Sequence, residues 1–198
     1  MILGNRIPYE YFITKGKGES DDGSEFLPFK VNSFDNALID AGLKNPNIIE
    51  YTSVMPPEAI QITKEEGIKR LKWGEVLECI KAQSNGNKGE QISSAVIITT
   101  IIDPSGKYLG GLACEYAGTQ NKFEVEKYFL NAIHEMIQKR GFGEIKNGIK
   151  MFTDNITEFG YIVHPGKIFE YESLIATKKF ASVITAICFV SHIYPVIE

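Results

Sequence analysis

The sequence predicts an α+β fold in which two largely antiparallel sheets stack face to face and helices cover their outer sides. Three observations predict it: strand-like stretches outnumber helical ones, strands and helices do not alternate as βαβ units, and no internal repeat or low-complexity linker divides the chain. Because the helices are too few to cover every strand, stacking the sheets buries the remaining apolar faces. We expect residues 1–198 to form one domain.

The first half of the chain predicts two strands, a loop and a helix. Residues 7–14 alternate and are rich in aromatic and β-branched side chains, which is typical of a strand, and the Gly-, Ser- and Asp-rich residues 16–26 predict a loop. Residues 32–42 carry apolar side chains at helical spacing, and Gly42 is expected to end the helix. Residues 47–54 predict a strand that two prolines stop.

The second half predicts a strand meander, a long helix and further strands. Turn-rich segments separate the strands expected in the meander, which are residues 75–83, 93–102 and 107–116. Residues 122–140 place their apolar side chains on one face and predict the main amphipathic helix. The remaining expected strands are residues 148–154, 158–164, 167–176 and 181–191, and the last is so apolar that burial on both faces is expected.

Composition excludes several classes of function. The chain has 21 Lys and Arg against 25 Asp and Glu, a net charge of −4, so we expect no nucleic-acid or anionic-membrane partner. The N-terminus has no signal-peptide pattern and no stretch is apolar enough to cross a bilayer, which favours the cytoplasm. Cys79, Cys114 and Cys188 are predicted to be reduced core thiols, and their spacing to the histidines indicates no metal site.

The stretch "NIIEYTSVMPPE", residues 47–58, places Thr52 and Ser53 at the end of an apolar strand. Ordinary strand termination by the following prolines would explain it. The alternative is chemical: a serine fixed between an extended strand and a rigid Val-Met-Pro-Pro segment could be strained so that its hydroxyl meets the preceding carbonyl. That is the geometry of an N-to-O acyl shift.

Carboxylates in three places also have two interpretations each. Asp35 lies in the first turn of the expected helix, where the helix dipole alone would favour it. Glu115, in the apolar "LGGLACEYAG", is expected to point inward and to hold its proton as a general acid, unless the strand end is solvated. Glu19, Asp21 and Asp22 exclude a phosphate-binding loop, which leaves a solvated loop or the rim of an active site.

Several of these motifs occur together in one known family. In "GKGESDDG", "SFDNALIDAGLKNPNIIEYTSVMPPE" and "GGLACEYAG", the chain resembles the pyruvoyl-dependent arginine decarboxylases, most closely their bacterial acid-resistance branch, over residues 11–193. The resemblance implies a four-layer αββα sandwich, assembled as a homotrimer or a dimer of trimers with sites between protomers. It also implies decarboxylation of L-arginine to agmatine and CO2.

The resemblance further implies that the chain makes its own cofactor. The precursor would cut itself between Thr52 and Ser53, giving a beta chain of residues 1–52 and an alpha chain of residues 53–198. Ser53 would become a covalent pyruvoyl group, the ketone of which reacts with the substrate's α-amine and accepts electrons when CO2 leaves, so neither pyridoxal phosphate nor a metal is expected.

Five residues besides the cleavage site take roles by this resemblance. Asn47 would hold the carbonyl that is attacked or the substrate, and Glu115 would return a proton to the α-carbon. Asp35 would receive the guanidinium group as a bidentate pair, and Leu38 and Val54 would also contact the substrate.

Two positions depart from the family pattern and keep alternatives open. Thr52 stands where many relatives have Ser, and its methyl group would crowd the cleavage site, while Lys44 adds a cation near the expected substrate channel. The alternatives are a non-catalytic oligomer that never matures and binds an amine ligand, and a decarboxylase of another basic amino acid.

Overall fold

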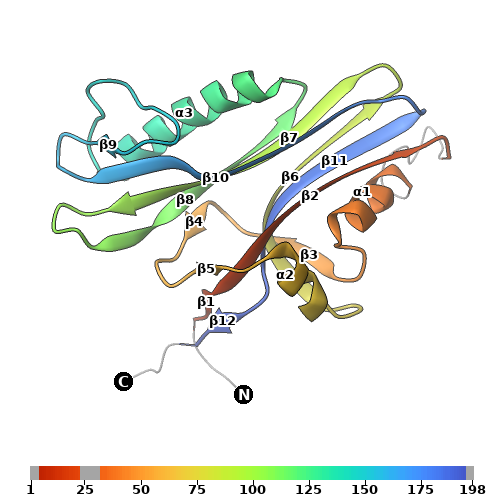
Figure 1. Ribbon diagram of the computed structural model, residues 1–198, viewed down its shortest axis with the longest axis horizontal. Helices are drawn as coiled ribbons and strands as arrows, with labels where there is room; N and C mark the ends of the chain where they lie inside the picture. The colour runs from red at the N-terminus through yellow and green to blue at the C-terminus, as the bar shows by residue number, and fades with distance from the viewer. Residues whose placement is uncertain (1–4, 23–31, 195–198) are drawn as a thin grey trace.

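Two five-stranded sheets stack face to face between layers of helix in the computed structural model, which describes residues 5–22 and 32–194 (Figure 1). The α1-side sheet has the order β3-β6-β11-β2-β5 and the α3-side sheet has the order β4-β8-β7-β10-β9. The helices are α1 (Ser33–Ala41), α2 (Lys64–Arg70) and α3 (Lys122–Lys139). The strands are β1 (Ile7–Pro8), β2 (Glu10–Ser20), β3 (Asn47–Glu50), β4 (Val54–Met55), β5 (Ile60–Gln61), β6 (Val76–Asn87), β7 (Gln91–Ile102), β8 (Tyr108–Gly118), β9 (Asn155–Ile156), β10 (Ile162–Ile175), β11 (Phe180–Phe189) and β12 (His192–Ile193).

Three apolar clusters separate the layers and confirm the predicted α+β sandwich. One joins α1 to its sheet and includes Phe12, Ala37 and Cys188, and another joins α3 to the opposite sheet and includes Phe129. The third lies between the sheets and includes Ile187. The layers therefore run helix, sheet, sheet, helix, which is the αββα arrangement that the resemblance implied.

The segment predicted as a loop at residues 16–26 is strand as far as Ser20, so that part of the prediction is wrong. The glycines are there because α1 lies against β2: a Cβ on Gly16 would stand 2.3 Å from the Ala37 carbonyl oxygen, and one on Gly18 would stand 2.4 Å from the Ala37 nitrogen. Close packing of a helix on a strand, and not a turn, explains these glycines. Residues 23–26 lie outside the described residues.

The acidic residues that follow serve the fold. Glu19 accepts hydrogen bonds from the backbone N–H groups of Thr177 (2.5 Å) and Lys178 (3.1 Å), and Asp21 accepts one from Lys179 (3.0 Å). These carboxylates hold the turn between β10 and β11. Their hydrogen bonds therefore support a structural role for this segment and do not support a place at the rim of an active site.

In two places, strands that were predicted to lie together belong to different sheets. Residues 47–54 form two strands, because β3 lies in the α1-side sheet and β4 in the α3-side sheet. The expected meander is broken after β6, which pairs with β11 and β3, while β7 and β8 pair with each other in the opposite sheet. A short turn can place the next strand beside the last one or across from it, and alternation alone does not distinguish the two.

The other predictions vary in outcome. The helices at residues 32–42 and 122–140 and the strand at 181–191 are confirmed, and β11 is buried throughout. Residues 148–154 contain a turn and no strand. The two strands expected after them are one strand, β10, with a register shift between His164 and Ile168. Helix α2 was not predicted, although Thr63 and Glu66 form a capping box at its start.

Candidate active site

The Thr52–Ser53 peptide bond lies on the segment where the chain crosses from one sheet to the other. On the side of β3, the Tyr51 N–H donates to the Cys79 carbonyl of β6 at 2.8 Å. On the side of β4, the Ser53 carbonyl accepts from the Ala113 N–H of β8 at 2.9 Å. The bond is therefore held from both ends, by strands that belong to different sheets.

A tight turn centred on Ser53 orients the carbonyl that precedes it. The Thr52 carbonyl accepts a hydrogen bond from the Val54 N–H at 3.1 Å, which closes a γ-turn. Among the described residues, Phe152 is the one non-glycine residue with a positive φ, so Ser53 has a negative φ and the turn is the common inverse form. The expected backbone strain at Ser53 therefore does not take the form of a left-handed conformation.

Glu115 lies close to this turn on the strand that holds it. Residues 113 and 115 of β8 project to the same face of the strand, and β4 pairs with β8 only at Leu112 and Gly111. Glu115 therefore stands beyond the end of β4, where its side chain is exposed in the single chain. Glu115 thus projects to the side of β8 that faces the other sheet, as Ala113 of the inter-sheet cluster does, but the predicted burial of its side chain is wrong because it is exposed.

The electrostatic surroundings of Glu115 nevertheless favour its protonated form. Partial desolvation by the protein raises the pKa of Glu115, and the negative charge of Glu50 raises it further. Glu50 lies at the end of β3 and pairs with Lys81, with 2.7 Å between Nζ and Oε1. Two carboxylates and one lysine are thus near the Thr52–Ser53 bond. Glu50 was not among the residues that sequence reasoning identified, and no local pattern singles it out.

Asn47 has other partners in the single chain. Its side-chain amide donates to the Gly74 carbonyl at 3.0 Å, and its own N–H donates to the Glu75 carbonyl at 2.7 Å. The donor that the Thr52 carbonyl does have is the Val54 N–H, a backbone group that residue types do not reveal.

Asp35 and Leu38 lie on α1, on the outer side of the α1-side sheet. Asp35 is exposed, and Leu38 is partly buried against the core beneath the helix. Neither has an interaction with residues 52–54 in the structure of one chain. Lys44, beyond the end of α1, is exposed as well. The structure thus brings together Thr52, Ser53, Val54 and Glu115, and leaves Asn47, Asp35 and Leu38 apart from them.

Comparison with known proteins shows which family the chain belongs to. The family model of the pyruvoyl-dependent arginine decarboxylases matches residues 10–193. The chain belongs to this family. Among its relatives, the protein named pyruvoyl-dependent arginine decarboxylase AaxB of Chlamydia caviae is 40% identical over 121 residues, which are 59% of this chain and 62% of that relative. The protein named pyruvoyl-dependent arginine decarboxylase 2 of Methanosarcina acetivorans is 32% identical over 95 residues, which are 48% of each chain. The alignment thus spans less than two thirds of the length of either relative.

The cysteines, the possible metal ligands and the helix lengths of this member of the pyruvoyl-dependent arginine decarboxylase family also bear on the predictions. Cys79, Cys114 and Cys188 are buried free thiols, as predicted. In the part of the chain that the structure describes, no group of three or more His, Cys, Asp or Glu side chains could hold a metal ion. No helix of residues 5–22 and 32–194 is both long enough and apolar enough to cross a membrane.

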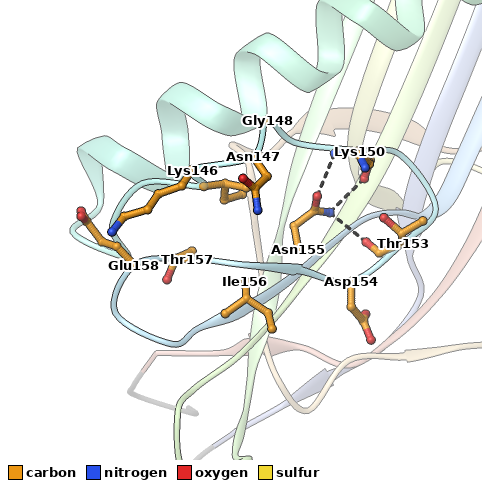
Figure 2. A pocket seen from close by; sticks show the side chains of 11 residues that line it. Lys146, Asn147, Gly148, Lys150, Thr153, Asp154, Asn155, Ile156, Thr157 and Glu158 are labelled. Carbon is orange, nitrogen blue, oxygen red and sulfur yellow. Dashed lines mark hydrogen bonds between the residues drawn. The ribbon is translucent and has the colours of Figure 1, made fainter.

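The segment before β10 forms an open cavity of about 590 Å³ (Figure 2). Asn155 organises it: its side chain accepts from the Lys150 N–H and donates to the carbonyls of Lys150 and Thr153, as the dashed lines in Figure 2 show. Asp154 also has a partner, since it contacts Nδ1 of His164 at 2.8 Å. Asn155 and Asp154 are thus bonded within the loop, whereas the side chains of Lys146, Asn147 and Lys150 make no hydrogen bond or ion pair with the described residues.

Proposed function

We propose that this protein cuts itself between Thr52 and Ser53 and then decarboxylates L-arginine to agmatine and CO2. The observation that carries the proposal is the geometry of the scissile bond: it is held between two sheets, and its carbonyl already accepts a hydrogen bond from the Val54 N–H. Membership of the family and the printed names of the relatives support the choice of substrate.

Self-cleavage follows from these residues as a balanced sequence. The Ser53 hydroxyl attacks the Thr52 carbonyl carbon, the C–N bond breaks, and an ester with a free amine at residue 53 results. While the carbonyl oxygen gains negative charge, the Val54 N–H stabilises it as an oxyanion donor. Loss of the Ser53 α-proton then expels the Thr52 carboxylate, and hydrolysis of the resulting dehydroalanine releases ammonia and leaves a pyruvoyl group on residue 53.

The residues present fit such a group. The carbonyl of Ser53 is bonded to the Ala113 N–H and not to anything on the side of Thr52, so this anchor survives cleavage and keeps residue 53 on β8. When formed, the pyruvoyl group supplies an electron sink for the electron pair that remains on the substrate's α-carbon after CO2 departs. All other steps are left to side chains around it.

Glu115 is the proton donor in this proposal. Its raised pKa keeps a larger fraction of the carboxyl group protonated near neutral pH, and its place on the same face of β8 as Ala113 sets it beside residue 53. Glu50 assists from β3 by its charge, and Lys81 limits that effect by pairing with Glu50.

Recognition of the guanidinium group requires a second chain. Asp35 and Leu38 lie on α1 and have no contact with Ser53 in their own chain, so we propose that a neighbouring protomer presents them, in a homotrimer or a dimer of trimers. A carboxylate such as Asp35 can bind the planar guanidinium through two parallel hydrogen bonds. In the same assembly Asn47, which is exposed, would contact the substrate or the Thr52 carbonyl. Decarboxylation consumes a proton, so we further propose a role in acid resistance.

Denaturing mass spectrometry of the purified protein tests the first step. We expect two fragments, one ending at Thr52 and one beginning at a blocked residue 53 that reacts with phenylhydrazine, and one uncut chain for Ser53→Ala. CO2 released from arginine, lysine and ornithine, each measured separately, tests the second step. Arginine or agmatine binding by an uncut chain that releases no CO2 would instead establish the non-maturing alternative.

A further inference from the structure

A second cavity, of about 250 Å³, lies between the two sheets beside the β4–β5 connection. Its apolar walls include Met55, Ile98 and Ile168. It is smaller than the cavities of roughly 300–1,000 Å³ that hold drug-sized ligands, so its occupant would be a small molecule.

Five polar side chains of the described residues line this cavity. They are Tyr11, Gln61, Thr100, Tyr108 and Lys167. None of the five side chains makes a hydrogen bond or an ion pair with any residue that the structure describes. Polar groups that converge on a cavity without partners of their own are available to a ligand.

Tyr11 is the most informative of these groups. The residue is only 8% exposed, because its ring packs between the sheets. In the described part of the chain, the buried side-chain oxygens that lack both solvent and a partner belong to Ser94, Thr99 and Thr185. The Tyr11 hydroxyl is not one of them, so this unpartnered oxygen reaches open space, and the space that Tyr11 lines is this cavity.

The charge of the lining selects an anion. Lys167 is the one charged residue of the described lining, and no carboxylate accompanies it. Burial raises the pKa of Tyr11 to about 12, and it also raises the pKa of Tyr108. Both phenols therefore stay neutral at physiological pH and can donate hydrogen bonds to an anionic oxygen.

We propose that this cavity binds a small organic monocarboxylate, with the carboxylate toward Lys167 and the two tyrosine hydroxyls and the apolar body against Met55 and Ile98. The occupant differs from the substrate, because a guanidinium group would meet Lys167 and find no carboxylate. The site is also separate from residue 53: Met55 is 3% exposed and lines the cavity, whereas Val54 is 53% exposed and belongs to the turn outside it.

Occupancy would affect the start of the alpha chain. Met55 and Pro56 both line the cavity and lie two and three residues after Ser53. A bound carboxylate would therefore pin the segment that follows the scissile bond, whether or not that bond has been cut. The inference does not depend on the proposed enzymatic activity.

Calorimetric titration with benzoate, and with benzamide as a neutral molecule of the same shape, tests the proposal on the whole protein. We expect benzoate to bind at least tenfold more tightly than benzamide. Tyr11→Phe, which removes one oxygen, should weaken benzoate binding about tenfold, as expected for a hydrogen bond to a charged group. Lys167→Met should weaken it by a similar or larger factor.

Matched controls are Tyr128→Phe and Lys150→Met, which change the same residue types away from the cavity and should bind benzoate as the unmodified protein does. Ser53→Ala should also bind benzoate unchanged, so failure of the enzymatic proposal is recognisable on its own. If Tyr11→Phe does not fold, Lys167→Met decides, because that side chain is exposed. Equal affinity for benzoate and benzamide, no binding at millimolar benzoate, or unchanged binding by Lys167→Met would overturn the proposal.

Discussion

Replacing Val54 by proline tests whether the backbone N–H at this position drives self-cleavage. The Val54 N–H donates to the Thr52 carbonyl within the turn and takes no part in the hydrogen bonds between β4 and β8 that the structure shows, so the substitution removes the proposed oxyanion donor. Proline also disfavours the turn conformation at residue 53. Loss of one such donor slows acyl chemistry by about 10²–10³-fold, or roughly 2.7–4 kcal/mol. Since the bond is 3.1 Å long, near the upper end of the usual range, we expect the lower figure.

The assay follows the disappearance of intact chain on denaturing gels after purification of the precursor. Val54→Ala is the matched control, because it shortens the same side chain and keeps the N–H. We expect Val54→Ala to mature at close to the unmodified rate and Val54→Pro to lag by about 10²-fold, with similar melting temperatures for both. Equal rates for the two variants, with both folded, would refute the oxyanion role of this group.

Three further changes test the electrostatics near Glu115 and the packing and hydrogen bonds of β2. Glu50→Gln removes the negative charge that helps to raise the pKa of Glu115. Activity that needs protonated Glu115 should therefore decline at a lower pH on the alkaline limb of the pH–rate profile. An unchanged profile, or the same shift for the control Glu58→Gln, would contradict this. Gly18→Ala should destabilise the fold by about 1–3 kcal/mol in urea unfolding, because its Cβ would stand 2.4 Å from the α1 backbone; an unchanged midpoint would show that the helix can move away. Burial alone would raise the pKa of Glu19, but the N–H groups that its carboxylate binds lower the pKa overall. The ionised carboxylate therefore stabilises the fold above its unfolded pKa, and this contribution is lost as the pH falls through the folded pKa. Glu19→Gln should lower the melting temperature at neutral pH and leave it unchanged in strong acid.

Elements whose signal is local could be predicted from the sequence. Helix α3 has its apolar stripe and its cap within one segment, and β11 is a continuous apolar run, so both are found where expected. The glycines of β2 were misjudged because their reason lies in α1, which is distant in sequence: only the packed structure shows that Gly16 and Gly18 make room for a helix backbone.

The candidate site could be predicted only in part for the same reason. Ser53 and Glu115 were identified from residue type and resemblance, and the structure places Ser53 directly before β4 and Glu115 on β8, the strand that pairs with β4. The groups that hold the scissile bond are the backbone N–H groups of Tyr51, Val54 and Ala113, and any residue except proline carries such a group. Their roles come from strand pairing across two sheets, which neither composition nor motif encodes.

Crossing between the sheets at residues 51–53 has a mechanical consequence for the proposed cleavage. The segment before the cut stays bound through β2 and β3, which pair with β11 and β6 of the α1-side sheet. The segment after the cut stays bound through β4, which pairs with β8 of the α3-side sheet. Since each new end is already fixed to a different sheet, breaking the bond removes the covalent link without removing either set of strand contacts. In the proposed reaction, residue 53 would change chemically while its carbonyl stays bound to the Ala113 N–H of β8, the strand that also carries Glu115.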